Sequence, residues 1–225
     1  RMEAVATRHA QGMRTARENI AALVDPGSFV EYGALAVAAQ RSRRSEADLI
    51  VNTPADGMVC GIGTLHGQRT VVMAYDATVL AGTQGMRNHQ KTDRMLGLAL
   101  QHRLSVVLLA EGGGGRPGDG DFALVAGLHV STFASFARLN GRVPVVGIAA
   151  GRCFAGNAAL LGCCDVVIAT QNSNIGMGGP AMVEGGGLGT FRPEDIGPAR
   201  VQHANGVIDV LVDDEDQAVA TARQY

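Results

Sequence analysis

The sequence predicts an α/β fold in which helices cover both faces of a mostly parallel sheet. Continuously apolar segments at 106–110, 143–149 and 165–169 are short enough to be strands and lack a polar side, as expected of strands buried on both faces. Segments with helical spacing lie between them, at 122–140 and 155–162. This alternation is typical of the α/β class. Because no repeat or linker divides the 225 residues, we expect one domain, 1–225.

The N-terminal region is expected to begin with one amphipathic helix. Residues 8–24 place Ile20 and Leu23 on the same side, and Asp25-Pro26-Gly27 is a typical helix stop. The polar residues 40–56 are expected to form a mobile loop.

The remaining elements follow from short-range patterns. Residues 58–65 and 70–75 flank a glycine-containing turn and predict a β-hairpin. Residues 86–103 carry apolar side chains at helical spacing. Near the C-terminus, 207–212 predicts a strand and 215–223 a helix, whose N-terminal acidic run suits the helix dipole.

Composition excludes several classes of function. The formal net charge of −2 and an aromatic content of 4% give no basic face or base-stacking platform, so we expect no nucleic-acid partner. No apolar run reaches the ~18 residues of a membrane span, and no signal peptide is evident. The four cysteines form no CxxC pair, so we expect reduced thiols, no metal site and a cytoplasmic location.

Glycine is concentrated where buried strands end. The strand at 106–110 runs through Glu111 into four glycines and Arg116. Peptide N–H groups without side chains around them can be aimed at a ligand oxygen. A P-loop is excluded because no Gly-Lys-Ser/Thr follows, and Arg116-Pro117 interrupts a dinucleotide fingerprint. The alternative interpretation is a flexible surface loop.

A second glycine segment follows the strand at 143–149. Gly151 opens a turn, and a helix of small residues begins near Ala155. A helix N-terminus offers unpaired N–H donors, although small residues there can also serve tight helix–strand packing. Neighbouring parallel strands would bring both glycine segments to one edge of the sheet. Each could then supply one N–H to a single oxygen, the oxyanion hole that an enolate of a thioester requires.

The chain resembles a known family over nearly its whole length. In order, the motifs are Arg14-Thr-Ala-Arg-Glu-Asn-Ile, Leu23-Val-Asp-Pro-Gly-Ser-Phe-Val-Glu31, Asp56-Gly-Met-Val, Tyr75-Asp-Ala-Thr-Val-Leu-Ala-Gly-Thr-Gln-Gly85, Lys91, the two glycine segments, Gly162-Cys-Cys-Asp165 and Ile175-Gly-Met-Gly-Gly-Pro180. They resemble the N-terminal half of the carboxyltransferase of acetyl-CoA, propionyl-CoA and methylcrotonyl-CoA carboxylases.

The resemblance implies a crotonase/ClpP-like spiral of ββα units and the transfer of a carboxyl group from carboxybiotin to the α-carbon of an acyl-CoA. This half would bind the CoA ester. A homologous second half would bring biotin, carried on a biotin carrier protein, and the site would lie between halves in a homo- or hetero-oligomer. No metal is expected in this chain.

The resemblance also implies site residues. Gly113 and Gly114 would form one catalytic loop, and Gly156 and Asn157 would stand at the N-terminus of the second helix. The CoA side would be served by basic residues: Arg14, Arg17 and Arg116. For Arg116, a structural role is equally compatible with its position after the glycines. Asn157 stands where the family often has a second glycine.

Other interpretations remain open from the sequence. The chain could be a non-catalytic acyl-CoA-binding or assembly subunit, or a CoA-ester decarboxylase or hydratase of the crotonase fold. A serine hydrolase is disfavoured because GxSxG is missing. A companion half encoded nearby would favour the carboxyltransferase. Nothing in the sequence identifies the acyl chain.

Overall fold

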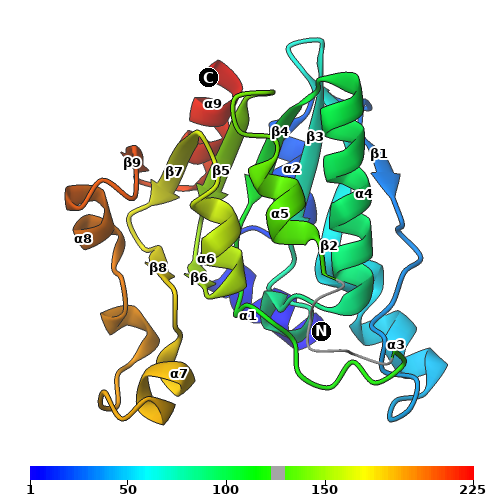
Figure 1. The fold of residues 1–225 in the computed structure, drawn as a ribbon, viewed down its shortest axis with the longest axis vertical. Helices are drawn as coiled ribbons and strands as arrows, with labels where there is room; N and C mark the ends of the chain where they lie inside the picture. Colours follow the sequence, from blue (N-terminus) through cyan, green and yellow to red (C-terminus); the bar gives the residue numbers. More distant parts are fainter. Residues whose placement is uncertain (123–129) are drawn as a thin grey trace.

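A seven-stranded sheet forms the centre of the computed structural model, which describes residues 1–122 and 130–225 (Figure 1). Its strand order is β1-β2-β3-β4-β5-β7-β9, antiparallel from β1 to β3 and parallel from β3 to β9. The strands are β1 Val30–Tyr32, β2 Met58–Leu65, β3 Gln68–Tyr75, β4 Ser105–Leu109, β5 Val145–Ala149, β7 Val166–Thr170 and β9 Val210–Val212.

A second, smaller sheet holds two parallel strands, β6 (Arg152–Phe154) and β8 (Asn174–Gly176). It lies just beyond the ends of β5 and β7, because β6 follows β5 after two residues and β8 follows β7 after three. The short strands therefore extend the molecule at the carboxyl edge of the parallel strands.

Helices cover both faces of the large sheet, as the sequence predicts (Figure 1). One face packs against α2 (Ala16–Leu23) and α9 (Glu215–Gln224). The other packs against α4 (Met86–His102), α5 (Thr132–Ala137) and α6 (Gly156–Leu161). The remaining helical segments are α1 Met2–Ala10, α3 Glu46–Asn52, η1 Pro54–Gly57, η2 Leu80–Gly82, α7 Pro180–Gly185, η3 Pro193–Asp195 and α8 Ala199–Ala204.

Strand alternation sorts the core into two layers. In β4, Val106 and Leu108 join the core under α4, whereas Val107 and Leu109 join the core under α2 and α9. Successive side chains of a strand point to opposite faces, so an apolar run buries both faces. Each fully buried aliphatic side chain contributes ~1.5–3 kcal/mol, which holds the central strands firmly beneath their loops.

Most expected elements are confirmed, including the hairpin of β2 and β3 and the helix α4. The single helix expected over 8–24 is wrong, because the chain forms α1 and α2 with Gly12 between them at φ 73°. The backbone N–H of Arg14 donates to Glu215 in this break, 2.7 Å away. The continuous loop expected over 40–56 is also wrong, because it contains α3 and η1. Of the helix expected over 122–140, α5 is present, and 123–129 lie outside the described residues.

Candidate active site

The ends of β4 and β5 meet, and each leads into a glycine segment. The two strands are parallel neighbours, with Leu109 opposite Ile148. Beyond them, the Gly112 N–H donates to the carbonyl of Arg152 (2.7 Å), and the Phe154 N–H donates to the carbonyl of Gly112 (2.9 Å). These bonds join the first glycine segment to β6. The two segments therefore lie at one edge of the sheet, as predicted.

Gly114 and the start of α6 come very close together. A Cβ added at Gly114 would lie 2.6 Å from the Cβ of Ala155 and 3.1 Å from the backbone nitrogen of Gly156. The Gly114 N–H donates to Oδ1 of Asn157 at 3.0 Å. Only a glycine, here at φ 82°, can occupy this position without moving the helix start. The four glycine-loop residues named from the sequence thus form one cluster.

The N–H groups of this cluster differ in how they are used. That of Gly114 is bonded to Asn157. That of Gly113 makes only a long contact of 3.3 Å to the carbonyl of Ala81. The N–H of Gly156 lies in the first turn of α6, where N–H groups have no acceptor within the helix. The first bond within α6 is donated by the Ala159 N–H to the carbonyl of Ala155. The N–H groups of Gly113 and Gly156 are therefore less engaged than that of Gly114; of these two glycines, Gly113 lines the pocket described next and Gly156 does not.

A pocket of about 610 Å³ opens beside the first glycine segment. This volume lies within the ~300–1,000 Å³ of typical small-molecule sites. Its wall combines backbone of the glycine segment with the small sheet, the α1–α2 break and the region after β8. The lining residues that matter here are Arg8, Met13, Glu111, Gly112, Gly113, Arg152, Phe154, Pro180 and Glu194.

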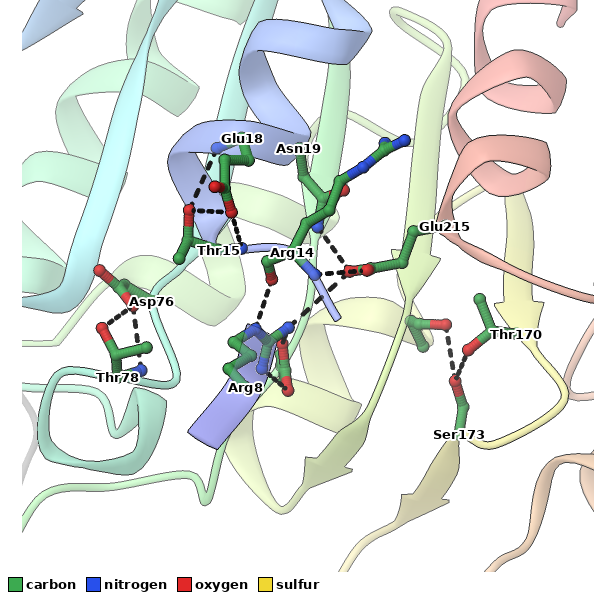
Figure 2. Close-up of polar contacts among 12 residues, drawn as sticks. Arg8, Arg14, Thr15, Glu18, Asn19, Asp76, Thr78, Thr170, Ser173 and Glu215 are labelled. Carbon is green, nitrogen blue, oxygen red and sulfur yellow. Dashed lines mark hydrogen bonds and ion pairs between the residues drawn. The ribbon is translucent and has the colours of Figure 1, made fainter. Parts of the chain in front are cut away.

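One side of the pocket is closed by a buried ion pair that fixes α1. Arg8 donates to both carboxylate oxygens of Glu111, at 2.7 Å each. Glu215 lies 3.8 Å from the same guanidinium and accepts the side-chain amide of Asn19 at 2.7 Å (Figure 2). Burial raises the pKa of the Glu111 carboxyl, and the hydrogen bonds and charge of Arg8 oppose that rise. A buried pair of this kind fixes geometry more than it adds stability.

The arginines expected on the CoA side lie elsewhere or are occupied. Arg14 forms an ion pair with Asp216. Arg17 is paired with Glu31 at 2.6 and 2.9 Å and lines a separate pocket of about 320 Å³. Neither of the two lines the pocket beside the glycine segment.

Arg116 is buried, with a side chain only 3% exposed. It is paired with Asp56 and also lies 3.6 Å from Asp119, and it donates to the carbonyl of Thr83 at 2.8 Å. These contacts tie the end of the glycine loop to the segment before β2 and to the start of α4. The contacts therefore favour the structural alternative for Arg116.

Three residues that the sequence did not single out belong to this site. Arg152 lines the pocket with a side chain 58% exposed, paired with Glu194. Ala155 holds φ 52° and ψ −121°, a conformation rare for residues with a side chain. The backbone of Gln84 bonds to that of Gly114 and Arg116 at 2.6 and 2.9 Å. Arg152 and Ala155 lie within the second glycine segment, and Gln84 lies in one of the motifs that carry the resemblance, so their positions were signals that could have been used.

Two classes of feature are absent from the part of the chain that the structure describes. Within 1–122 and 130–225, no group of three or more His, Cys, Asp or Glu side chains could hold a metal ion. No described helix is long and apolar enough to cross a membrane.

A parallel sheet whose strand ends carry two glycine-rich backbone loops over one pocket defines a chain of the crotonase-like fold, the fold of its structural neighbours. More specifically, the chain belongs to the carboxyl transferase domain family, whose model matches residues 7–225.

Curated relatives support this assignment. The chain is 32% identical over 224 residues to the propionyl-CoA carboxylase beta chain of Saccharopolyspora erythraea, covering 98% of this chain and 40% of the relative. It is 30% identical over 221 residues to the methylmalonyl-CoA carboxyltransferase 12S subunit of Propionibacterium freudenreichii subsp. shermanii, covering 98% and 41%. The chain thus spans about 40% of the length of these relatives.

Solved structures give the same family. A single-chain, multi-domain long-chain acyl-CoA carboxylase matches with a TM-score of 0.94 and 64% identity, over 100% of this chain and 23% of that one. A Pseudomonas malonate decarboxylase hetero-tetramer matches with a TM-score of 0.79 and 26% identity, over 94% and 81%.

Proposed function

We propose that this chain is the acyl-CoA-binding domain of a biotin-dependent carboxyltransferase. It would direct a carboxyl group from carboxybiotin to the α-carbon of an acyl-CoA. The observation that best supports this proposal is the 64% identity, over the whole chain, to part of a long-chain acyl-CoA carboxylase. The same observation favours a long-chain acyl group as substrate. The glycine-lined pocket of about 610 Å³ supplies the site for the thioester.

In this mechanism the thioester carbonyl oxygen accepts hydrogen bonds from the N–H groups of Gly113 and Gly156. Both bonds strengthen as the α C–H bond breaks and negative charge moves onto that oxygen. Biotin, when bound, would supply the carboxyl group and take up the α-proton, so that one C–N and one C–H bond break and one C–C and one N–H bond form. No residue of this chain is assigned to biotin.

The CoA part of the ligand needs a cation that can reach its phosphates. Arg8 is held by Glu111 and only 10% exposed, whereas the side chain of Arg152 is 58% exposed on the same pocket. Arg152 is thus the better candidate for phosphate contact. An arginine can move from the carboxylate of Glu194 to a phosphate, because both match its planar fork.

The partners follow from the proposed reaction. A homologous second carboxyltransferase half would bring carboxybiotin, carried on a biotin carrier protein, to this pocket in a homo- or hetero-oligomer. A CoA-ester decarboxylase is the second candidate, and the likeness to a chain of the malonate decarboxylase hetero-tetramer favours it. The two differ in product, since a decarboxylase releases CO₂ and needs no carboxyl acceptor.

Replacing Gly113 by Val tests this function. A Cβ at Gly113 meets only the Thr83 methyl group, at 3.5 Å, so the loop can accommodate the side chain, which then fills the space of the thioester. With carboxybiotin, an acyl-CoA and the second half supplied, we expect the rate of carboxyl transfer to fall by at least ~10²-fold, because the blocked thioester can no longer reach the Gly113 N–H and one missing oxyanion bond costs about that much.

Gly115→Val is the matched control, because a Cβ there meets nothing within 4 Å. It should keep carboxyl transfer near the unmodified rate. A folded Gly113→Val protein with unchanged transfer would reject this site. Release of CO₂ from a carboxyacyl-CoA without biotin would favour the decarboxylase instead.

A further inference from the structure

The side chain of Asn157 lies at the junction of the two glycine segments and is completely buried. Its Oδ1 accepts the Gly114 N–H at 3.0 Å. Its Nδ2 donates to the carbonyl of Gly82 at 3.1 Å and to the carbonyl of Glu111 at 3.0 Å. Both amide hydrogens and the amide oxygen are therefore bonded to backbone, and each bond reaches a segment far from α6 in the sequence.

Two of these bonds enclose the peptide that carries the Gly113 N–H. The carbonyl of Glu111 belongs to the peptide before it, and the N–H of Gly114 belongs to the peptide after it. Gly112 and Gly114 have φ of 137° and 82°. A glycine adopts positive and negative φ almost equally well, so the backbone at these two positions is not fixed by its own conformational preference. The peptide itself is held by the Phe154 N–H, which donates to the Gly112 carbonyl at 2.9 Å, and by the long bond from Gly113 to Ala81; the two Asn157 bonds add a restraint on each side of it.

The third bond of the Asn157 side chain holds a turn with strained backbone, at Gly82. Gly82 ends a left-handed turn in which Leu80 and Ala81 have φ of 46° and 55°. A Cβ at Gly112 would lie 2.2 Å from the carbonyl oxygen of Gly82, so the turn and the glycine loop touch through backbone. Strained backbone of this kind persists only where its surroundings fix it. The amide of Asn157 is one such restraint, through the Gly82 carbonyl.

We propose that the Asn157 side chain is a positioning residue that aims the two oxyanion donors at one point. Asn157 directly follows Gly156, so the side chain that fixes the direction of the Gly113 N–H also links it to the second donor. This inference rests on the proposed function, because it assigns Asn157 a role in the rate of enolate formation. Asn157 itself touches backbone and not the substrate.

The test compares Asn157→Ala with Asn88→Ala in the assembled carboxyltransferase that contains this chain. Asn88 is equally buried, and its side-chain amide makes one bond of 3.4 Å. Asn157→Ala should lower kcat by ~10²-fold, the loss of one oxyanion donor, and change KM for acyl-CoA by less than about threefold. Asn88→Ala should lower the melting temperature and leave kcat unchanged.

Amide hydrogen exchange tests the same inference without measuring catalysis. In Asn157→Ala the Gly114 amide loses its acceptor, so its exchange should become at least ~10-fold faster while the amides of β4 keep their protection. Asn157→Asp retains the acceptor but not the donors and has the same shape. It should lose kcat and keep the Gly114 amide protected, which provides a second variant if the alanine protein does not fold.

Two outcomes overturn the inference. One is a kcat near the unmodified value in a folded Asn157→Ala or Asn157→Asp protein, and the other is a Gly114 amide whose exchange in Asn157→Ala does not change. Failure of the proposed function looks different, because the unmodified protein would then transfer no carboxyl group. In that case the exchange of the Gly114 amide alone decides whether Asn157 fixes the loop.

Discussion

Ala155 holds a backbone conformation that suits glycine better than alanine. Its φ of 52° and ψ of −121° place it just before α6, where the Ala155 N–H donates to the carbonyl of Gly176 at 2.9 Å. Side chains in such regions cost ~1–3 kcal/mol, and this strain is characteristic of sites where backbone has a function. Here the strained residue is the N-cap of α6, directly before the Gly156 N–H.

Replacing Ala155 by Gly should therefore not destabilise the protein. The released strain exceeds the ~0.4–1 kcal/mol that a glycine adds to the entropy of the unfolded chain, so we expect a gain of about 1 kcal/mol in the free energy of unfolding. Denaturation in urea measures it. Ala159→Gly, inside α6, is the control and should cost about 1 kcal/mol. Equal losses at both positions would show that Ala155 is not strained.

At the scale of elements, α2 shows how a local signal sets a helix start. The Thr15 side chain accepts the Glu18 N–H, and the Glu18 carboxylate accepts the Thr15 N–H at 2.7 Å. The backbone hydrogen bond from Thr15 is the main reason that the pKa of Glu18 falls from 4.5 to about 2, and the hydrogen bond with His9 adds to it. This reciprocal cap begins α2 after the break at Gly12.

The cap predicts a pH-dependent stability. Because the pKa of Glu18 is lower in the folded state, its contribution is full above pH ~4.5 and is lost as the pH falls toward 2. Glu18→Gln keeps an acceptor for the Thr15 N–H but removes the negative charge, so it should cost ~0.3–1 kcal/mol of unfolding free energy at pH 7, the usual value of an acidic charge in the first turn of a helix. The gap between the two proteins should narrow between pH 5 and pH 3, measured by urea denaturation.

The control for this experiment is Glu46→Gln in α3. Glu46 also lies in a first helical turn, but in α3 the capping bond is donated by the Asp48 N–H to the Ser45 hydroxyl and does not involve Glu46. Its substitution should change stability less. A gap that is constant from pH 7 to pH 3 in Glu18→Gln would contradict the assigned role of the carboxylate.

How far the sequence predicts the fold depends on whether the deciding contacts are local. The hairpin, α4 and the parallel strands follow from periodicity, and both glycine segments are found because strands run directly into them. The break between α1 and α2 had local signals, Gly12 and the capping box of Thr15 and Glu18, but the bond from Arg14 to Glu215 that holds it spans 201 positions and does not follow from the sequence. The burial of Arg116 likewise depends on Asp56, which lies before β2.

The candidate site shows the same division. The two glycine segments could be found because each follows a buried strand, and Gly113 and Gly156 could be named through the family resemblance, with a flexible loop and tight helix–strand packing as the alternatives. The side-chain bonds of Asn157 could not, because their partners belong to two segments, the first glycine segment and the turn at Gly82, that only the folded chain brings to α6. A residue that positions others leaves no periodic signal of its own.

At the scale of the whole molecule, the pocket occupies the edge that parallel α/β sheets generally offer to ligands. It lies beyond the carboxyl ends of β4 and β5, in line with the rule for open α/β sheets. The two core layers pack those strands from both faces. The site is rigid on the sheet side and is bordered by α1 and by the segment after β8.

The proposed division of labour between two halves leads to the last prediction. The residues placed at the pocket account for the thioester and the CoA, and the chain spans about 40% of its curated relatives. Carboxyl transfer requires the enolate carbon and the carboxyl carbon to be held ~3–3.5 Å apart. We therefore expect the 225-residue chain alone to bind a long-chain acyl-CoA and to transfer no carboxyl group.

Titration calorimetry measures the first expectation, and a carboxybiotin-coupled assay with and without the second half measures the other. Addition of the second half should restore transfer, because that half would bring the carboxybiotin that donates the carboxyl group. The Gly113→Val chain is the control and should stay inactive in both conditions. Substantial turnover by the chain alone would mean that the biotin site lies within these 225 residues. A chain that binds no CoA ester would instead act in assembly, and the pocket beside Gly113 would have another ligand.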